Sequence, residues 1–281
     1  MPSATTPYDS RVYNFLAPSD INIFAFKVDY EQDYKKGKLG FGGKTSFVKT
    51  KNHFERYNVF TSGSVLDVPR SNEFEYNENI NALYVNYNKQ LKGKMIQFGV
   101  RSENTVSQGD TYGLYSNGTV NTSSKTSFKR NYIDFFPSGS ITFNKNPMKQ
   151  WSFSYSRRID RPAYQNLNPF EFKLDEYTYQ KGNTDLRPQY SNIVSITNVY
   201  KYRLTTKLSY SHVKDMFTQI VDTAEKSKSF ITQKNLATQD IISLNISYPY
   251  QYKWYSMFVN INSFYSMYKA DFGGGSRTID L

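Results

Sequence analysis

The chain has 281 residues, carries a formal net charge of +11 and is 17% aromatic, yet its mean hydropathy is only −0.66. It has no run of about 20 apolar residues, which excludes helical membrane spans, and so many aromatic residues are not typical of disorder. The absence of cysteine excludes disulfides and thiolate metal sites, and the two histidines, His53 and His212, match no metal or hydrolase motif. We therefore expect no enzyme, no cofactor and no bound metal.

The N-terminal residues 1–10, MPSATTPYDS, have neither the basic region nor the apolar stretch of a signal peptide. We therefore expect either a protein that stays inside the cell or an internal piece of a longer exported chain.

An alternation of apolar and polar residues with a period of two runs through the chain, whereas a helical period is almost absent. It occurs, in chain order, at residues 24–30, 96–101, 151–156, 204–211, 242–248 and 255–262. In one of these segments Trp151, Phe153 and Tyr155 alternate with three serines. Strands with one apolar and one polar face indicate a sheet whose two sides meet different surroundings. Trp151, Phe153, Leu208 and Val259 are expected to share the apolar side.

Short, lysine-rich turns recur near positions 36, 92, 147, 201 and 251, at separations of 56, 55, 54 and 50 residues. Longer polar connections lie between them, over 52–78, 106–131, 159–190 and 218–236. The pattern predicts about ten strands in five hairpins, with short turns at one end and long loops at the other. Such asymmetry, with strands of about 10 residues, is typical of outer-membrane barrels.

Aromatic residues and lysines gather beside the short turns, for example at Tyr34, Tyr87, Trp151 and Tyr200. Amphipathic rings favour the headgroup layer of a membrane, and lysines at the same level reach lipid phosphates. Outer-membrane lipid and lipopolysaccharide are therefore expected partners. A soluble β-sandwich also alternates, so it remains an alternative, but composition and spacing favour the barrel.

The segment from Phe136 to Tyr200 contains FPSGSITF (136–143), WSFSYSRRIDRPAYQNLNPF (151–170) and YTYQKGNTDLRPQYSNIV (177–194). It resembles the β-barrel of TonB-dependent outer-membrane receptors, specifically the outer membrane protein beta-barrel family abundant in Bacteroidetes. The matching positions are Tyr155, Ser156, Arg157, Arg158, Arg161, Pro162, Leu167, Asn168, Pro169, Phe170, Gly182, Asn183, Leu186 and Pro188. Thr184 stands where the family usually has proline.

The resemblance implies an all-β, antiparallel up-and-down transmembrane barrel in the outer membrane of a Gram-negative bacterium. Residues 1–281 are then one partial barrel of about ten strands, without a signal peptide or plug domain, because family barrels have about 22 strands around a plugged lumen. Its two edge strands are expected near 21–32 and 254–267. A complete ten-stranded barrel fits the length, but the missing export signal argues against it.

The resemblance also implies a receptor that captures a scarce ligand and imports it, driven by the inner-membrane TonB complex acting through the missing plug. The imported substance is expected to be a small ligand, a glycan or a peptide. A soluble or surface-exposed β-sheet protein that binds polysaccharide is the alternative function. An outer-membrane enzyme would need clustered acids, serine and histidine, and nucleic acid is not expected because the basic residues are spread over the turns.

The matched loop residues have physical roles of their own. Proline cannot donate to a strand ladder, so Pro162, Pro169 and Pro188 mark where pairing stops. The Gly182-Asn183 pair suits a turn with positive φ. Together with Asn168 and Phe170, these residues are expected to fold the loop more than to touch a ligand.

The three arginines of the same loop, Arg157, Arg158 and Arg161, are expected to pair with Asp160, Asp175 and Glu176. The ligand-contact candidates are the loop 159–190 and the loop 106–131 with Tyr112, Tyr115 and Asn117.

Overall fold

The structure is a computed structural model that describes residues 11–175, 177–223, 228–271 and 276–280. Its elements, in chain order, are β1 (Val12–Leu16), β2 (Ser19–Tyr34), β3 (Gly37–Phe60), β4 (Gly63–Leu66), η1 (Val68–Arg70), β5 (Asn72–Leu91), β6 (Lys94–Leu114), β7 (Val120–Phe143), β8 (Lys149–Asp160), η2 (Tyr164–Leu167), β9 (Glu171–Lys173), β10 (Thr178–Lys181), β11 (Gln189–Tyr200), β12 (Leu204–Asp222), β13 (Ser229–Tyr252), β14 (Tyr255–Asp271) and β15 (Ser276–Asp280). Only η1 and η2 are helical in these ranges, and both are short 3₁₀ turns. Among the described residues no helix has the length and hydrophobicity to cross a bilayer.

Ten long strands form five antiparallel hairpins, β2–β3, β5–β6, β7–β8, β11–β12 and β13–β14. Two-residue turns with positive φ close several of them, as at Lys35 and Lys36 (φ 48° and 61°), and such turns match the right-handed twist of the strands. The predicted hairpin rhythm is confirmed.

The sheet holds fifteen strands in the described ranges, so the prediction of about ten is too low. The additional strands β1, β4, β9, β10 and β15 have only three to five residues each. Segments this short carry too little alternation to be recognised in the sequence.

Most of the long connections are shorter than expected. The predicted loop 106–131 is largely strand, because β6 and β7 pair up to Leu114 and Val120, and residues 115–119 alone form the turn. The connections predicted over 52–78 and 218–236 are likewise occupied largely by strand residues. Only the connection between β8 and β11 is as long as predicted. The outward-facing positions of these strand ends are polar, as at Glu73, Glu75 and Asn77 of β5, so the alternation that puts apolar residues on the outward face stops there.

The register places the apolar side chains on one face. Phe153 lies opposite Ile196, which lies opposite Leu208, which lies opposite Leu244, and Tyr248 on that face lies opposite Val259. Phe153 and Leu208 are 45% and 47% exposed. Trp151, two residues from Phe153, shares this face, so the expected common side of the four residues is confirmed.

The apolar face ends at a defined level above the short turns. On β3 its last ring is Phe47, and the outward-facing positions that follow are Lys49 and Lys51. A membrane strand needs about 9–11 residues, whereas β3 and β7 each have 24. The strands therefore continue well beyond the hydrocarbon layer, on the side of the longer connections.

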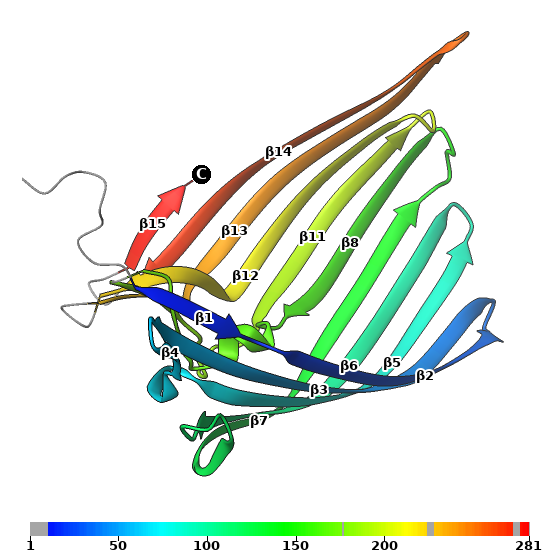
Figure 1. Ribbon diagram of the computed structural model, residues 1–281. Coiled ribbons are helices and arrows are strands. Elements are labelled where there is room, and N and C mark those ends of the chain that lie inside the picture. Colours follow the sequence, from blue (N-terminus) through cyan, green and yellow to red (C-terminus); the bar gives the residue numbers. More distant parts are fainter. Residues whose placement is uncertain (1–10, 176, 224–227, 272–275, 281) are drawn as a thin grey trace, which may run out of the picture.

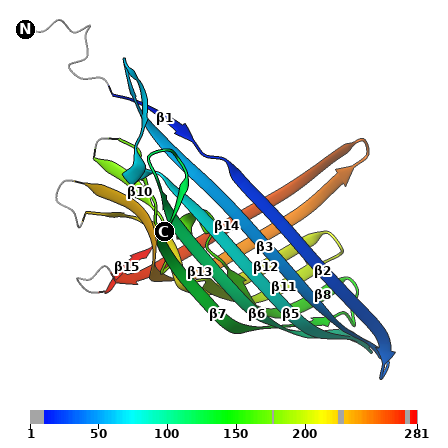
Figure 2. The same ribbon diagram turned by 60° about the horizontal axis from the view of Figure 1, so that its bottom comes forward.

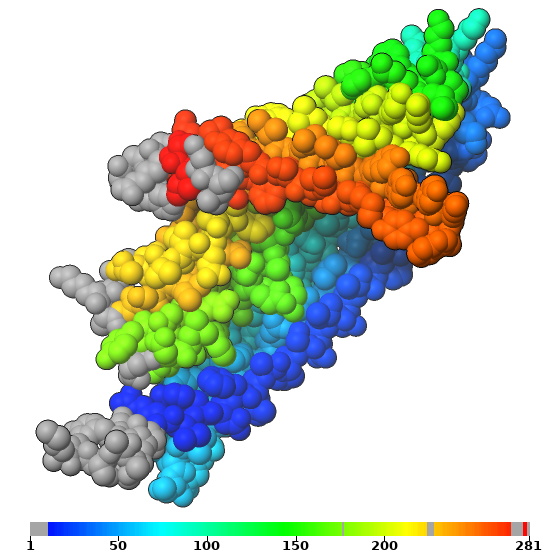
Figure 3. All heavy atoms as spheres, turned by 90° about the horizontal axis from the view of Figure 1, so that it is seen from above, coloured from blue at the N-terminus to red at the C-terminus, as the bar shows by residue number. Residues whose placement is uncertain are grey.

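The sheet is strongly curved and open. Figure 1 shows it bending from β2 to β14, and in Figure 2 the strands of its two walls, β2–β7 and β11–β14, cross at a steep inclination. From above, the molecule is hollowed between the blue β2 edge and the orange-red β14 edge (Figure 3). In the described part of the chain β2 pairs only with β3, and β14 pairs with β13 and, over a few residues, with β15. The expected edge strands are confirmed.

The concave face carries the buried core. Phe74 and Tyr76 of β5 form it with Leu167 and Leu186, which come from the connection between β8 and β11. That connection therefore lies inside the curve of the sheet.

Candidate functional site

Residues 161–188, which we call the lumen loop, fold down onto the concave face instead of rising away from the sheet. Leu167 ends the 3₁₀ turn η2, and both it and Leu186 are almost completely buried. The ring of Tyr164 stacks on that of Tyr76, with centroids 6.4 Å apart. Burial of these apolar groups against β5 holds the loop in place.

Arg161 anchors the start of the lumen loop. Its Nη2 donates to Oε2 of Glu103 at 2.7 Å and to Oγ1 of Thr105 at 2.9 Å, and its Nε donates to the hydroxyl of Tyr132 at 3.3 Å. Burial is the largest single influence and lowers the pKa of Arg161, but the hydrogen bonds and charges of Glu103 and Tyr132 together outweigh it, so the pKa is raised. The guanidinium therefore stays charged and binds β6 and β7 together.

Arg130 of β7 anchors the other end of the loop. Its Nη1 donates to the carbonyl of Leu186 and its Nη2 to the carbonyl of Thr184. A planar guanidinium suits two neighbouring carbonyls because its donors are fixed in a fork. The loop is thus fastened near both ends by an arginine.

Two asparagines of the matched family positions shape the loop between these anchors. Oδ1 of Asn168 accepts from the backbone N–H of Phe170 at 3.2 Å and from Nδ2 of Asn72 at 3.2 Å. Nδ2 of Asn183 donates to the carbonyl of Gln233 at 2.9 Å. These bonds join the loop to β5 and β13.

Gly182 serves a different purpose from the one expected. Neither Gly182 nor Asn183 is among the described residues with positive φ, so the turn prediction is wrong. The backbone of Asn168 instead approaches so closely that a Cβ on Gly182 would overlap its carbonyl. Glycine is required there because two backbone segments touch.

The expected partners of the arginines are also corrected. Arg161 pairs with Glu103, Arg157 lies over the ring of Tyr190 at 5.1 Å, and Arg158 is exposed. Asp160 accepts from Nε2 of Gln189. Asp175 accepts the backbone N–H groups of its own turn, first that of Tyr177 and then that of Thr178, and these bonds lower its pKa. Glu176 lies outside the described residues.

The three prolines lie at the places where pairing stops. Pro162 follows the end of β8 and Pro188 precedes β11, and both are buried, while Pro169 is half-buried before β9.

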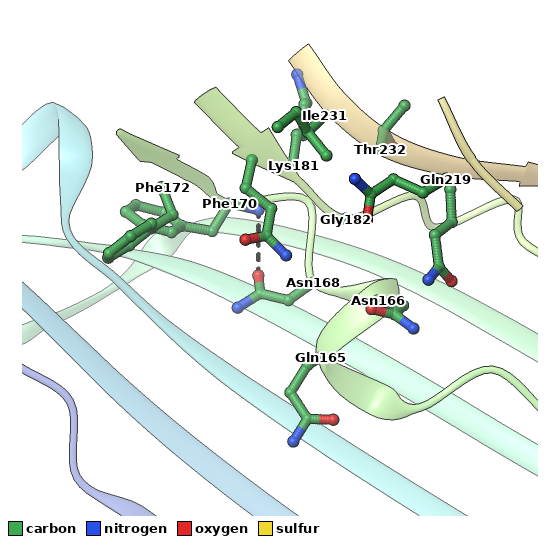
Figure 4. A pocket seen from close by; sticks show the side chains of 12 residues that line it. Gln165, Asn166, Asn168, Phe170, Phe172, Lys181, Gly182, Gln219, Ile231 and Thr232 are labelled. Carbon is green, nitrogen blue, oxygen red and sulfur yellow. Dashed lines mark hydrogen bonds between the residues drawn. The ribbon is translucent and has the colours of Figure 1, made fainter. Parts of the chain in front are cut away.

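A pocket of about 220 Å³ opens between the lumen loop and the strands β12 and β13 (Figure 4). Its walls are amide side chains, two phenyl rings, one lysine and one glycine, from Gln165, Asn166, Asn168, Phe170, Phe172, Gln180, Lys181, Gly182, Gln219 and Gln233, together with Ile231 and Thr232. Nζ of Lys181 is neutralised by Glu171 at 2.9 Å.

The chemistry of the pocket is polar and nearly uncharged. Oε1 of Gln233 is buried and accepts no hydrogen bond within the described chain. Amides offer both donors and acceptors, and a phenyl ring offers a face for stacking. The pocket can therefore hold groups rich in hydroxyls or amides. Within the same ranges no cluster of carboxylates and imidazoles that could hold a metal ion is found.

The hairpin with Tyr112, Tyr115 and Asn117 does not contribute to this pocket. Tyr112 belongs to β6, with Nζ of Lys125 over its ring at 5.6 Å. Oδ1 of Asn117 accepts from the backbone N–H of Thr119 at 3.1 Å, which stabilises a tight turn. The three residues lie on one hairpin, and none of them lines the pocket beside the lumen loop.

Sequence reasoning missed the partners on the strands, above all Glu103, Arg130 and Gln233. One signal was available: Glu103 and Arg130 sit at positions whose side chains face inward according to the alternation of β6 and β7. Charged groups facing a lumen indicate contact with something inside it.

We predict that Gly182→Ala destabilises the lumen loop by about 1–3 kcal/mol, the usual cost of overpacking. The added methyl would collide with the Asn168 backbone, which cannot move aside as a side chain can. The measurement is thermal unfolding of the full-length protein, together with the rate of proteolysis within 161–188. Gly43→Ala is the matched control, since a Cβ there meets its nearest atom at 3.4 Å. Equal stability of both variants would contradict the close approach.

The match to a known family covers nearly the whole chain. The model of the outer membrane protein beta-barrel family matches residues 2–279. Among curated protein sequences no significant match is found.

Several solved structures share the fold. The ferric yersiniabactin uptake receptor FyuA from Yersinia pestis is 11% identical with a TM-score of 0.56, over 98% of this chain and 43% of that one. The copper transporter OprC is 10% identical with a TM-score of 0.58, over 91% and 42%. The siderophore receptor PiuA from Acinetobacter baumannii is 13% identical with a TM-score of 0.52, over 93% and 41%. The chain therefore spans about two-fifths of the length of these proteins.

Proposed function

The chain belongs to the outer membrane protein beta-barrel family, and from this premise we propose that it forms part of a TonB-dependent receptor that captures a scarce ligand and imports it. As a member of this family it lies in the outer membrane of a Gram-negative bacterium. We further propose that residues 1–281 are one part of a large barrel, whose other strands pair with β2 and β14.

The observation that carries the proposal is the contrast between the two faces of one open sheet. The convex face carries a band of exposed apolar side chains, while the concave face carries the serines and other polar residues of the alternating strands and holds the lumen loop with its pocket. A large barrel encloses a lumen, and a structured loop inside that lumen provides a surface to which a ligand can bind. The alternative of a soluble sheet requires the apolar face to be covered, and the exposed rings of that face speak against it.

In the proposed mechanism the pocket lined by Asn168 and Phe170 holds the ligand by hydrogen bonds and stacking. The turn carrying Tyr115 and Asn117 stands at the same end of the strands and offers a second contact surface. Energy transmitted by the TonB complex through a plug domain would then release the ligand inward. No bond is made or broken, so no catalytic group is proposed.

Import can be tested with the full-length receptor that includes this chain. Cells with and without the receptor are given separate pools of ferric siderophores, cobalamin, oligosaccharides and peptides, and uptake is measured by mass spectrometry. We expect receptor-dependent uptake from one pool, abolished by deletion of TonB. Uptake that persists without TonB would indicate a passive channel and overturn the proposal.

We predict that the two ends of the strands lie on opposite sides of the membrane. The chain has no cysteine, so Asn117→Cys and Asn146→Cys each introduce a single thiol into it. These residues are a matched pair, because each is exposed and each accepts a backbone N–H of its own turn. A membrane-impermeant maleimide should label Asn117→Cys in intact cells and Asn146→Cys only after permeabilisation. Labelling of both in intact cells would exclude a transmembrane sheet.

A further inference from the structure

The convex face has a hollow of about 550 Å³ directly above the apolar band. Its base includes Phe24 and Phe47, which lie opposite each other on β2 and β3. Two positions further along the strands, a straight row of side chains crosses the sheet, in the order Asn22, Lys49, Asn77, Gln108 and Lys129. The hollow therefore joins an apolar base to a polar row with a lysine on either side of two amides.

The two lysines of this row have no carboxylate of their own. Among the described residues neither Lys49 nor Lys129 forms an ion pair, and both are exposed. Three of the nearby acids have other partners: Lys51 bonds Glu73 at 2.9 Å and Glu75 at 3.4 Å, and Lys125 bonds Asp110 at 3.2 Å. Asp20, which is exposed opposite Lys51, forms no ion pair among the described residues. Since neighbouring strands are about 4.8 Å apart, the backbones of the two lysines are about 14 Å apart. Their long side chains can close on one anion between them.

A second hollow lies lower on the same face of the sheet. It measures about 520 Å³ and has an almost entirely apolar lining, which includes Val28, Phe41, Leu83 and Val100. It opens at Gly43, the residue between Val28 and Leu83 in the cross-strand row, because glycine has no side chain to fill the space.

The two hollows are spaced as the two ends of a lipid are. Gly43 and Lys49 are six residues apart on β3, or about 20 Å along the strand. With a tilt of about 40° this is about 15 Å along the membrane normal, half the thickness of the hydrocarbon core. The apolar hollow thus lies near mid-membrane and the lysine row at the headgroup level of the outer leaflet.

We propose that this convex face binds a phosphorylated glycolipid of the outer leaflet. An acyl chain lies in the hollow at Gly43, the phosphate lies between Lys49 and Lys129, and the amides of Asn77 and Gln108 bond sugar hydroxyls. A phosphate between two ammonium groups forms charge-assisted hydrogen bonds, and the amides distinguish a sugar from a glycerol headgroup. The site depends on the outer-membrane location and not on which ligand is imported.

The test uses the full-length receptor, delipidated in detergent, with monophosphorylated lipid A as the probe. Lipid bound per protein is counted by native mass spectrometry over a concentration series. We expect one tightly bound lipid A, and a roughly 30-fold weaker affinity for the double variant Lys49→Gln and Lys129→Gln. The control is Lys44→Gln with Lys207→Gln, which removes the same charge from the concave face. It should bind as the unchanged protein does.

Three further binding measurements separate the contributions of the phosphate, the apolar hollow and the sugar to the affinity for lipid A. Dephosphorylated lipid A should bind as weakly as the double lysine variant binds the phosphorylated form. Gly43→Leu, which fills the apolar hollow, should weaken binding of lipid A, while Gly43→Ala should weaken it less. Phosphatidylglycerol should bind more weakly than lipid A, and equal binding would show a general anionic-lipid surface and overturn the glycolipid assignment. Lipid A binding that is insensitive to the lysine variant would overturn the site itself. Ligand import by the lysine variant should stay normal, so that this result and the test of import fail independently.

Discussion

Replacement of Glu103 by glutamine is expected to lower the free energy of unfolding of the intact protein by about 3–5 kcal/mol. The side chain of Glu103 is only 9% exposed and accepts hydrogen bonds from two guanidiniums, those of Arg161 and Arg101. Glutamine keeps the volume but removes the charge, which leaves both arginines without a counter-ion in a poorly hydrated place. The measurement is a urea titration in lipid vesicles, followed by circular dichroism.

The companion variant Arg161→Gln gives a sharper comparison. It is expected to lower the free energy of unfolding by less than Glu103→Gln does, because Arg101 still neutralises the carboxylate of Glu103. Proteolysis of residues 161–188 should nevertheless accelerate, since the lumen loop loses its first anchor. As a matched control, Glu31→Gln removes a carboxylate from an exposed pair with Lys38 and should leave the stability unchanged. A larger loss for Arg161→Gln than for Glu103→Gln would contradict this account of the cluster.

Replacement of Leu208 by arginine is expected to destabilise the membrane-inserted protein by about 2–4 kcal/mol. Leu208 lies on the apolar face, four residues from the start of β12 and thus near the middle of the hydrocarbon layer. A guanidinium there must leave water or draw water and headgroups inward. The measurement is the same titration in vesicles, combined with the yield of folded protein.

The neighbouring Ser209→Arg is the control for this prediction, because Ser209 faces the concave side in a row with two other serines. It should be tolerated, as Lys207 is on the same face. If Leu208→Arg and Ser209→Arg lowered the free energy of unfolding equally, the two faces would not meet different surroundings. The assignment of the convex face to lipid would then be wrong.

The sequence predicts the hairpin rhythm and the two faces because both depend on near neighbours. A turn needs only the residues that form it, and alternation within one strand is enough to assign Trp151 and Leu208 to the lipid side. Strand length is harder to predict. Above the membrane, residues such as Asn77 and Lys129 are polar on a face that is apolar lower down, so the alternation vanishes while the ladder continues.

The lumen loop could be predicted only in part, for the opposite reason. Its prolines and glycine mark it as an irregular segment, and the resemblance singles out the same positions. Its partners, however, are far away in the chain: Glu103 is 58 residues from Arg161, and Leu186 is 56 residues from Arg130. The close contact of Gly182 with Asn168 likewise depends on how the loop folds back, which no local pattern contains.

The unpaired edges of the sheet have a consequence for how the protein is inserted into the membrane. Along β2 and much of β14, every second N–H and C=O points away from the only neighbour that the described strands supply. Each such group, left without a hydrogen bond, would cost several kcal/mol in the hydrocarbon core of a bilayer, where no water can bond to it. If further strands pair with β2 and β14, as we propose, a sheet that entered the bilayer before them would carry this cost along both edges. On that proposal we expect lateral closure of the barrel and its insertion into the membrane to be coupled.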